Sequence, residues 1–180
     1  LLMFVVTNGI QRMYSYNAYT FAQAYQVQNA RLGLQTFIRD IREMTFADDG
    51  TFPLAIMEPH RIGFYSDVDR DNSVEYIEFA YQSTSTVAKY VYNATGSPPV
   101  YDTSTPNETI ILSRYVQNNL QATSTFFYYD ASGNAITNPS NITDVRYIET
   151  QVIVNIDPIR DPGQFMLRSS AALRNVKENL

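Results

Sequence analysis

Residues 1–44, LLMFVVTNGIQRMYSYNAYTFAQAYQVQNARLGLQTFIRDIREM, decide the fold of this chain. The first six side chains are all apolar, and the first charged residue is Arg12. Apolar residues then recur at helical spacing, namely Phe21, Tyr25, Val27, Leu34, Phe37, Ile38, Ile41 and Met44. The pattern predicts a single amphipathic helix from Leu1 to about Met44, with an apolar tip at its start.

A helix of that length would span about 66 Å, so it must protrude from its own domain. We therefore expect residues 1–24 to form a protruding apolar half, suited to a membrane or a filament core, and residues 25–180 to form a globular α+β domain. The side chains expected to pack the helix on a sheet are Leu34, Phe37, Ile38, Ile41 and Met44. The alternative is two ordinary core helices, broken near Asn8-Gly9 or Leu32-Gly33.

After the helix, the chain reads as strands and loops. Ala47-Asp48-Asp49-Gly50 is a helix stop, and apolar alternation then predicts strands over residues 54–57, 61–66, 74–82, 86–92, 108–116, 123–130, 145–156 and 164–174. Residues 93–107 contain three prolines and a glycine, which predicts an exposed loop. One long helix followed by strands predicts an α+β fold, with the long N-terminal helix packed on an antiparallel β-sheet.

The composition excludes several classes of function. A net charge of −5 with scattered basic residues argues against nucleic-acid binding, and the absence of cysteine removes disulfides and thiol chemistry. The first residue is not Met, and six apolar residues are far fewer than the roughly 20 that cross a bilayer, so we expect an N-terminus that is processed or missing. Tyrosines of the predicted strands, such as Tyr76, Tyr81, Tyr90, Tyr92, Tyr128 and Tyr129, suit either the core and cross-strand pairs or a face for a partner.

The sequence offers little for catalysis. His60 is the only histidine and lies in a Glu-Pro-His turn, where we expect a solvated side chain. There is no Gly-x-Ser-x-Gly elbow and no glycine-rich phosphate loop. We therefore predict neither an enzyme nor a binder of a small-molecule substrate.

One segment, residues 67–78, has the ligand spacing of a calcium loop. Its candidate calcium ligands are Asp67, Asp69, Asp71, Ser73, Glu75 and Glu78, and Asn72 stands where such a loop needs glycine. Because the flanking residues read as strands, Glu75 and Glu78 would point to opposite faces of a sheet. A solvated acidic turn is the competing interpretation, and calcium is the only cofactor that the sequence suggests.

Three tripeptides match the N-glycosylation pattern, and all lie in predicted loops. The acceptor residues are Asn93, Asn107 and Asn141. In a chain this rich in Asn and Thr, chance matches are expected, so the sites are candidates only.

Six ordered segments carry a resemblance to a known family: LQTFIRDIR (residues 34–42), IGFYSDVDRD (62–71), VEYIEF (74–79), LSRYV (112–116), FYYDASGN (127–134) and LRN (173–175). In this order, behind an apolar helix tip, they resemble the type IV pilin-like proteins, and within them the W-type minor pilins and the J-type minor pseudopilins of type II secretion. The leader-peptidase glycine of the family, the phenylalanine that follows it and the early glutamate are not in this sequence.

The resemblance implies a non-catalytic structural subunit of a pilus-like filament, which assembles through its N-terminal helix and displays a β-rich domain. Its partners would be other pilin-like subunits, and the inner membrane before assembly. The expected location is a filament on the cell surface or in the periplasm, with a single membrane pass before assembly. The residues assigned to the filament or membrane are Leu1, Leu2, Met3, Phe4, Val5, Val6 and Ile10. The alternative function is a membrane-anchored adhesin or a calcium-tuned ligand-binding module.

Overall fold

The computed structural model describes residues 2–71, 73–82, 85–158 and 164–174. Helix α1 (Leu2–Arg42) is one helix of 41 residues, so the alternative of two broken helices is wrong. The helix ends two residues before Met44, because the amide of Glu43 is shared between the carbonyls of Arg39 and Asp40 and the turn tightens. Met44 is instead buried and pairs in a β-bridge with Ser66.

The predicted strands form two antiparallel sheets and a small hairpin. The five-stranded sheet has the order β1-β2-β3-β4-β7, with β1 (Leu54–Met57), β2 (Arg61–Ser66), β3 (Glu75–Gln82), β4 (Thr86–Tyr92) and β7 (Glu108–Arg114). The three-stranded sheet has the order β10-β9-β8, with β8 (Phe126–Tyr129), β9 (Tyr147–Val154) and β10 (Phe165–Ala172). The α+β class expected from the sequence is confirmed.

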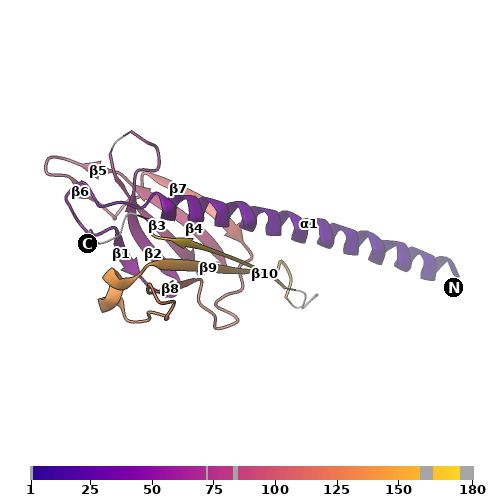
Figure 1. Ribbon diagram of the computed structural model, residues 1–180. Helices are drawn as coiled ribbons and strands as arrows, with labels where there is room; N and C mark the ends of the chain where they lie inside the picture. Colours follow the sequence, from indigo (N-terminus) through magenta and orange to yellow (C-terminus); the bar gives the residue numbers. More distant parts are fainter. Residues whose placement is uncertain (1, 72, 83–84, 159–163, 175–180) are drawn as a thin grey trace.

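The segment predicted as a plain loop is more ordered than expected. Residues 93–107 contain the two-stranded hairpin of β5 (Ala94–Thr95) and β6 (Val100–Tyr101). Before β9 lies a 3₁₀ helix, η1 (Pro139–Asp144), capped by the side chain of Asn138. In Figure 1 both elements lie at the end of the molecule farthest from the N-terminus.

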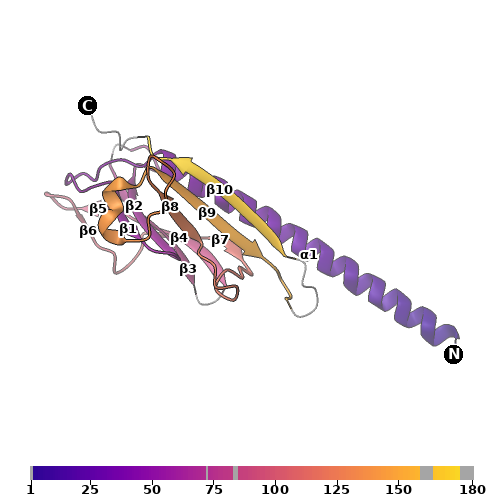
Figure 2. The same ribbon diagram turned by 60° about the horizontal axis from the view of Figure 1, so that its bottom comes forward.

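Helix α1 lies lengthwise against both sheets. It contacts β7 of the larger sheet and β10 and β9 of the smaller one, as Figures 1 and 2 show. A β-bridge between Val116 and Val154 connects the two sheets where the chain leaves β7. The N-terminal half of the helix extends beyond the strands (Figure 1). No helix in the described part of the chain combines the length and hydropathy that a membrane span requires.

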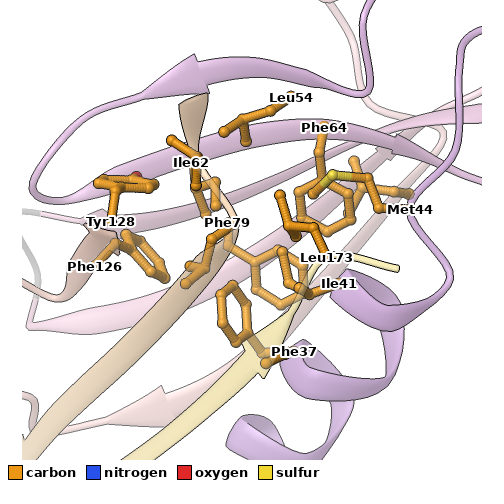
Figure 3. Close-up of a cluster of buried hydrophobic side chains, with 14 of the residues drawn as sticks. Phe37, Ile41, Met44, Leu54, Ile62, Phe64, Phe79, Phe126, Tyr128 and Leu173 are labelled. Carbon is orange, nitrogen blue, oxygen red and sulfur yellow. The ribbon is translucent and has the colours of Figure 1, made fainter. Parts of the chain in front are cut away.

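The main hydrophobic core lies between the C-terminal end of α1 and the two sheets (Figure 3). The ring of Phe37 packs edge-on against Phe79 of β3, with 5.0 Å between ring centres, and lies tilted against Phe126 of β8, with 5.4 Å between ring centres. One helical side chain therefore contacts both sheets. Leu34 packs in a second cluster with Val87, Val116, Val152 and Val154.

The face of α1 that is buried differs from the predicted apolar stripe between residues 21 and 30. Phe21 and Tyr25 were expected in that stripe, but both side chains are exposed. The side chains that turn toward the sheets include Gln23, Ala30, Leu34, Phe37 and Ile41, which we call the buried face of α1. These residues follow a helical repeat, but the first two, Gln23 and Ala30, are polar and small, respectively. A search for large apolar side chains therefore selects the neighbouring face of the helix, which carries Phe21 and Tyr25.

Gly33 lets β7 approach the helix closely. A Cβ atom at this position would lie 2.9 Å from Leu112 Cβ and 3.0 Å from the Leu112 carbonyl oxygen. Glycine is therefore required by contact with a neighbouring strand and does not break the helix.

Candidate functional site

The first candidate site is the N-terminal half of α1, residues 2–22, which we call the protruding half. Met3, Phe4, Val6 and Ile10 were assigned to a filament or membrane, and all are exposed in the structure. Leu1 lies outside the described residues, and of Leu2 and Val5 only the helical backbone is described. The exposed apolar surface continues along the protruding half through Met13, Tyr14, Tyr16 and Phe21.

Hydrogen bonds between the side chains of α1 and the strands begin at Tyr19 and Gln23. Tyr19 donates a hydrogen bond of 3.4 Å to the side chain of Asn155. Gln23 is buried, donates to the carbonyl of Val154 at 3.0 Å and accepts from the amide of Ile156 at 3.0 Å. Gln23 therefore holds the helix at the end of β9, just where the protruding half begins.

A buried ion pair fixes the other end of the helix. Lys89 Nζ on β4 lies 2.7 Å from Asp40 Oδ2 on α1, and the two side chains are 4% and 0% exposed. Arg39, which is more exposed, donates to Asp40 Oδ1 at 3.1 Å. Both carboxylate oxygens of Asp40 are therefore satisfied, which offsets part of the cost of removing the charges from water.

The helix-packing residues named from the sequence lie in the two cores. Phe37, Ile38, Ile41 and Met44 belong to the main cluster, and Leu34 belongs to the second. The sequence reasoning missed Gln23, Ala30, Gly33 and Asp40, which lie on the same side of the helix. A signal for Asp40 was present, because it is the only acidic residue in the 42 positions up to Arg42.

The second candidate site is the acidic loop between β2 and β3. Ligand oxygens of Asp67, Asp69 and Asp71 all lie within 4.8 Å of one another. Each of these carboxylates also accepts a backbone amide from the loop, from Arg70, Asp71 and Ser73 respectively. Three close carboxylates repel one another, and a divalent cation would remove that repulsion. Calcium binding stays a prediction, which thermal melting with calcium against chelator tests.

The other predicted ligands do not form one set with the three aspartates. Glu75 is buried at the start of β3 and accepts the amide of Val68 at 3.0 Å. Glu78 lies on the opposite face of β3, where it pairs with Arg61 at 2.6 Å and accepts from Tyr76 at 3.4 Å. The role of Glu78 as a bidentate ligand is therefore wrong, since three residues of strand place it on the other face. Asn72 lies outside the described residues.

Burial raises the pKa of Glu75 to about 7. The hydrogen bond from Val68 lowers this pKa, while the charges of Asp69, Asp67 and Asp71 raise it further. Glu75 therefore changes its charge near neutral pH, directly beneath the acidic loop.

The remaining candidates are single residues. His60 is partly buried, with Nδ1 3.1 Å from Thr125 Oγ1, and burial lowers its pKa. His60 is therefore less solvated than the turn sequence suggested. The sequon residues Asn93, Asn107 and Asn141 are all exposed, and Asn107 Oδ1 accepts the amide of Asn93.

The tyrosines of the predicted strands differ in burial, and the structure supports a core role for those that are buried. Tyr76, Tyr92 and Tyr128 are buried, whereas Tyr81, Tyr90 and Tyr129 are partly exposed. Tyr76 and Tyr92 are cross-strand partners whose rings lie 5.6 Å apart.

Comparison with known proteins adds no relatives, because no family model, no curated protein and no solved structure matches the chain. The geometry of the chain itself must therefore support any functional assignment. That geometry is a long helix, docked along one half on two antiparallel sheets and exposed along the other.

Proposed function

We propose that this chain is a non-catalytic structural subunit of a pilus-like filament, a pilin or a minor pilin or pseudopilin, that assembles through its protruding half. The observation that carries the proposal is the exposed apolar surface of Met3, Phe4, Val6, Ile10 and Met13. No described residue of the same chain covers this surface, and exposed apolar surfaces of this kind mark interaction sites.

The arrangement of the rest of the molecule supports the same function. A long N-terminal helix packed on antiparallel strands is compatible with the pilin-like architecture that the six sequence segments suggest. Between other subunits, the protruding halves would pack by van der Waals contact into a filament core, and the sheets would remain outside. The location that follows is a filament on the cell surface or in the periplasm, with the apolar tip held by a membrane before assembly.

The test replaces two exposed tip residues with lysine. Phe4 and Val6 are 72% and 52% exposed, so the double variant Phe4→Lys, Val6→Lys should keep the melting temperature of the sheets. It should lose incorporation into filaments, measured by electron microscopy and by sedimentation of filaments, because lysines cannot enter an apolar helix bundle without a large desolvation cost.

A matched control is Leu120→Lys, which removes a 76% exposed apolar side chain from a loop away from α1. This variant should enter filaments normally. Normal incorporation of the Phe4→Lys, Val6→Lys variant would overturn the proposal and would favour a surface adhesin that does not polymerise.

A further inference from the structure

A groove follows one side of α1. Its larger part, of about 460 Å³, lies between the helix and residues Ile110 to Arg114 of β7. A second part, of about 440 Å³, lies nearer the N-terminus, between the helix and residues Tyr115 and Ile156. Gln26 lines both parts, so the two parts adjoin along the face of the helix from Ser15 to Thr36, and we call them together the groove.

The floor and rims of the groove suit an apolar helix. Ala18 and Ala22 line it on the α1 side, and small residues let a second helix approach closely. Leu32 on α1 and Ile111 on β7 stand on opposite sides, 52% and 45% exposed. An occupant with apolar side chains would cover both.

The polar groups of the groove point to an uncharged occupant that carries hydrogen-bond donors. Arg114 and Asp157 are the only charged residues among the described residues that line it. The side-chain oxygen of Gln26 is buried and has no hydrogen-bond partner within the described residues. A buried amide oxygen of this kind is costly until a donor reaches it.

The edge of β7 is a poor template for an added strand. The register between β4 and β7 shifts at Leu112, which faces no residue of β4. The Leu112 carbonyl also lies against Gly33. A bulge and a covered carbonyl interrupt the row of backbone groups that an incoming strand would need, which leaves a helix as the better occupant.

We propose that this groove binds the protruding half of α1 of a second copy of the chain. Residues 1–11 and 13–30 contain no charged side chain, so the protruding half brings only Arg12, and Asn8 and Gln11 offer amide donors. At 1.5 Å per residue, the groove from residue 15 to 36 is about 33 Å long, and the part of the helix that precedes it, residues 2 to 14, would fill about 20 Å of it.

The contact would join different surfaces of identical subunits. Such heterologous contacts propagate into open helical assemblies when the rotation does not close a ring. The inference rests on the proposed function, because it names the surface that receives each helix in the filament.

The test is disulfide cross-linking, which the absence of native cysteine makes clean. A double variant, Ile10→Cys and Ile111→Cys, places one thiol on the protruding half and one on the β7 side of the groove. Filament preparations of the full chain are oxidised with copper phenanthroline and separated without reductant. We expect a ladder of multimers, because each subunit can bond to two neighbours.

Ala55 supplies the matched control. It is exposed on β1, at the edge of the five-stranded sheet opposite β7. The Ile10→Cys, Ala55→Cys variant should give no ladder. Leu32→Cys in place of Ile111→Cys tests the other side of the groove and should again give a ladder.

The outcomes separate this inference from the proposed function. One outcome would overturn the groove contact and leave a filament subunit. In it, filaments form, the cysteine at position 10 cross-links only to position 10 of a neighbour, and the Ile111→Cys variant gives no higher yield of multimers than the Ala55→Cys variant. A chain that forms neither filaments nor any cross-linked species would overturn both.

Discussion

The two halves of α1 belong to one continuous helix but are held in different ways. From Gln23 to Ile41, the helix is fixed by buried side chains, by hydrogen bonds to the end of β9 and by the Asp40–Lys89 pair. From Met3 to Ala18, the described side chains are exposed. A helix of about 20 residues is marginal alone, so the docked half serves as the nucleus from which the protruding half continues.

The comparison shows that one continuous helix can be stabilised by tertiary contacts along one half and can lack them along the other. The docked half is specified by what it touches, whereas the protruding half keeps an apolar surface that nothing in the described chain covers. Substitutions of the same kind in the two halves should therefore have very different effects.

The largest difference should come from aspartate substitution. Ile41→Asp removes a fully buried apolar side chain and leaves an unpaired carboxylate, which should cost at least about 4 kcal/mol of unfolding free energy. Ile10→Asp, in the exposed half, should change it by less than about 0.5 kcal/mol. Urea unfolding followed by circular dichroism measures both. An Ile41→Asp variant that melts within a degree of the parent would contradict the packing described.

Breaking the buried ion pair should have the next largest effect. Asp40→Ala leaves Lys89 buried without its carboxylate partner, and removal of one member of such a pair typically costs about 3–5 kcal/mol. The double variant Asp40→Leu, Lys89→Met should recover most of that loss, because an apolar pair needs no compensation. If the double variant is no more stable than Asp40→Ala, the pair is not what attaches this end of α1.

Changes in pH should act on the sheets and spare the protruding half, which has no carboxyl side chain. Glu75 has an ordinary pKa of 4.5 and a folded-state pKa of about 7, so the folded state holds its proton longer. The contribution of Glu75 to the free energy of unfolding is therefore largest below about pH 4.5 and falls by about 3 kcal/mol as the pH rises from 4.5 through 7.

Glu75→Gln is the matched variant, because glutamine keeps the oxygen that accepts the amide of Val68. It should be more stable than the parent at pH 8 and should lose this part of the pH dependence. Urea titrations between pH 4 and pH 8 give the comparison, and parallel curves for parent and variant would assign the pH dependence to other groups.

Glycine provides the smallest and most direct comparison of the two halves. Gly33→Ala would drive a methyl group into Leu112 and should destabilise by about 1–3 kcal/mol. At Gly9, a Cβ meets nothing within 4 Å, so Gly9→Ala should increase helicity, by about 0.5–1 kcal/mol in helix propensity. The same substitution thus changes sign along one helix. Circular dichroism and thermal melting measure the two effects. Changes of the same sign for Gly33→Ala and Gly9→Ala would contradict the difference described between the two halves.

Much of the fold could be predicted from the sequence, because α1 and the strands have strong periodic patterns. The bounds of β1, β2 and β4 agree with the predicted runs. The face of the helix was harder, since Gln23, Ala30 and Gly33 carry little hydrophobic signal. The partner of Asp40 could not be found, because Lys89 lies 49 residues away on a strand whose alternation gives no sign of an ion pair.

The acidic site shows the same limit. The spacing of Asp67, Asp69 and Asp71 predicted that they would cluster, since a short turn brings alternate residues together. The strand predicted over residues 74–82 also placed Glu75 and Glu78 on opposite faces, which the structure confirms, so calcium-loop spacing alone was the reason to include Glu78 as a ligand.

The lengthwise docking of α1 also has a mechanical consequence. A pull on the N-terminus along the helix axis would load the contacts of Gln23, Leu34, Phe37 and Ile41 in parallel, because all lie along the direction of the force. Contacts loaded together in shear share the tension, whereas contacts peeled open one after another fail in sequence. A subunit of this shape would therefore carry tension along a thread while the sheets at its side remain folded.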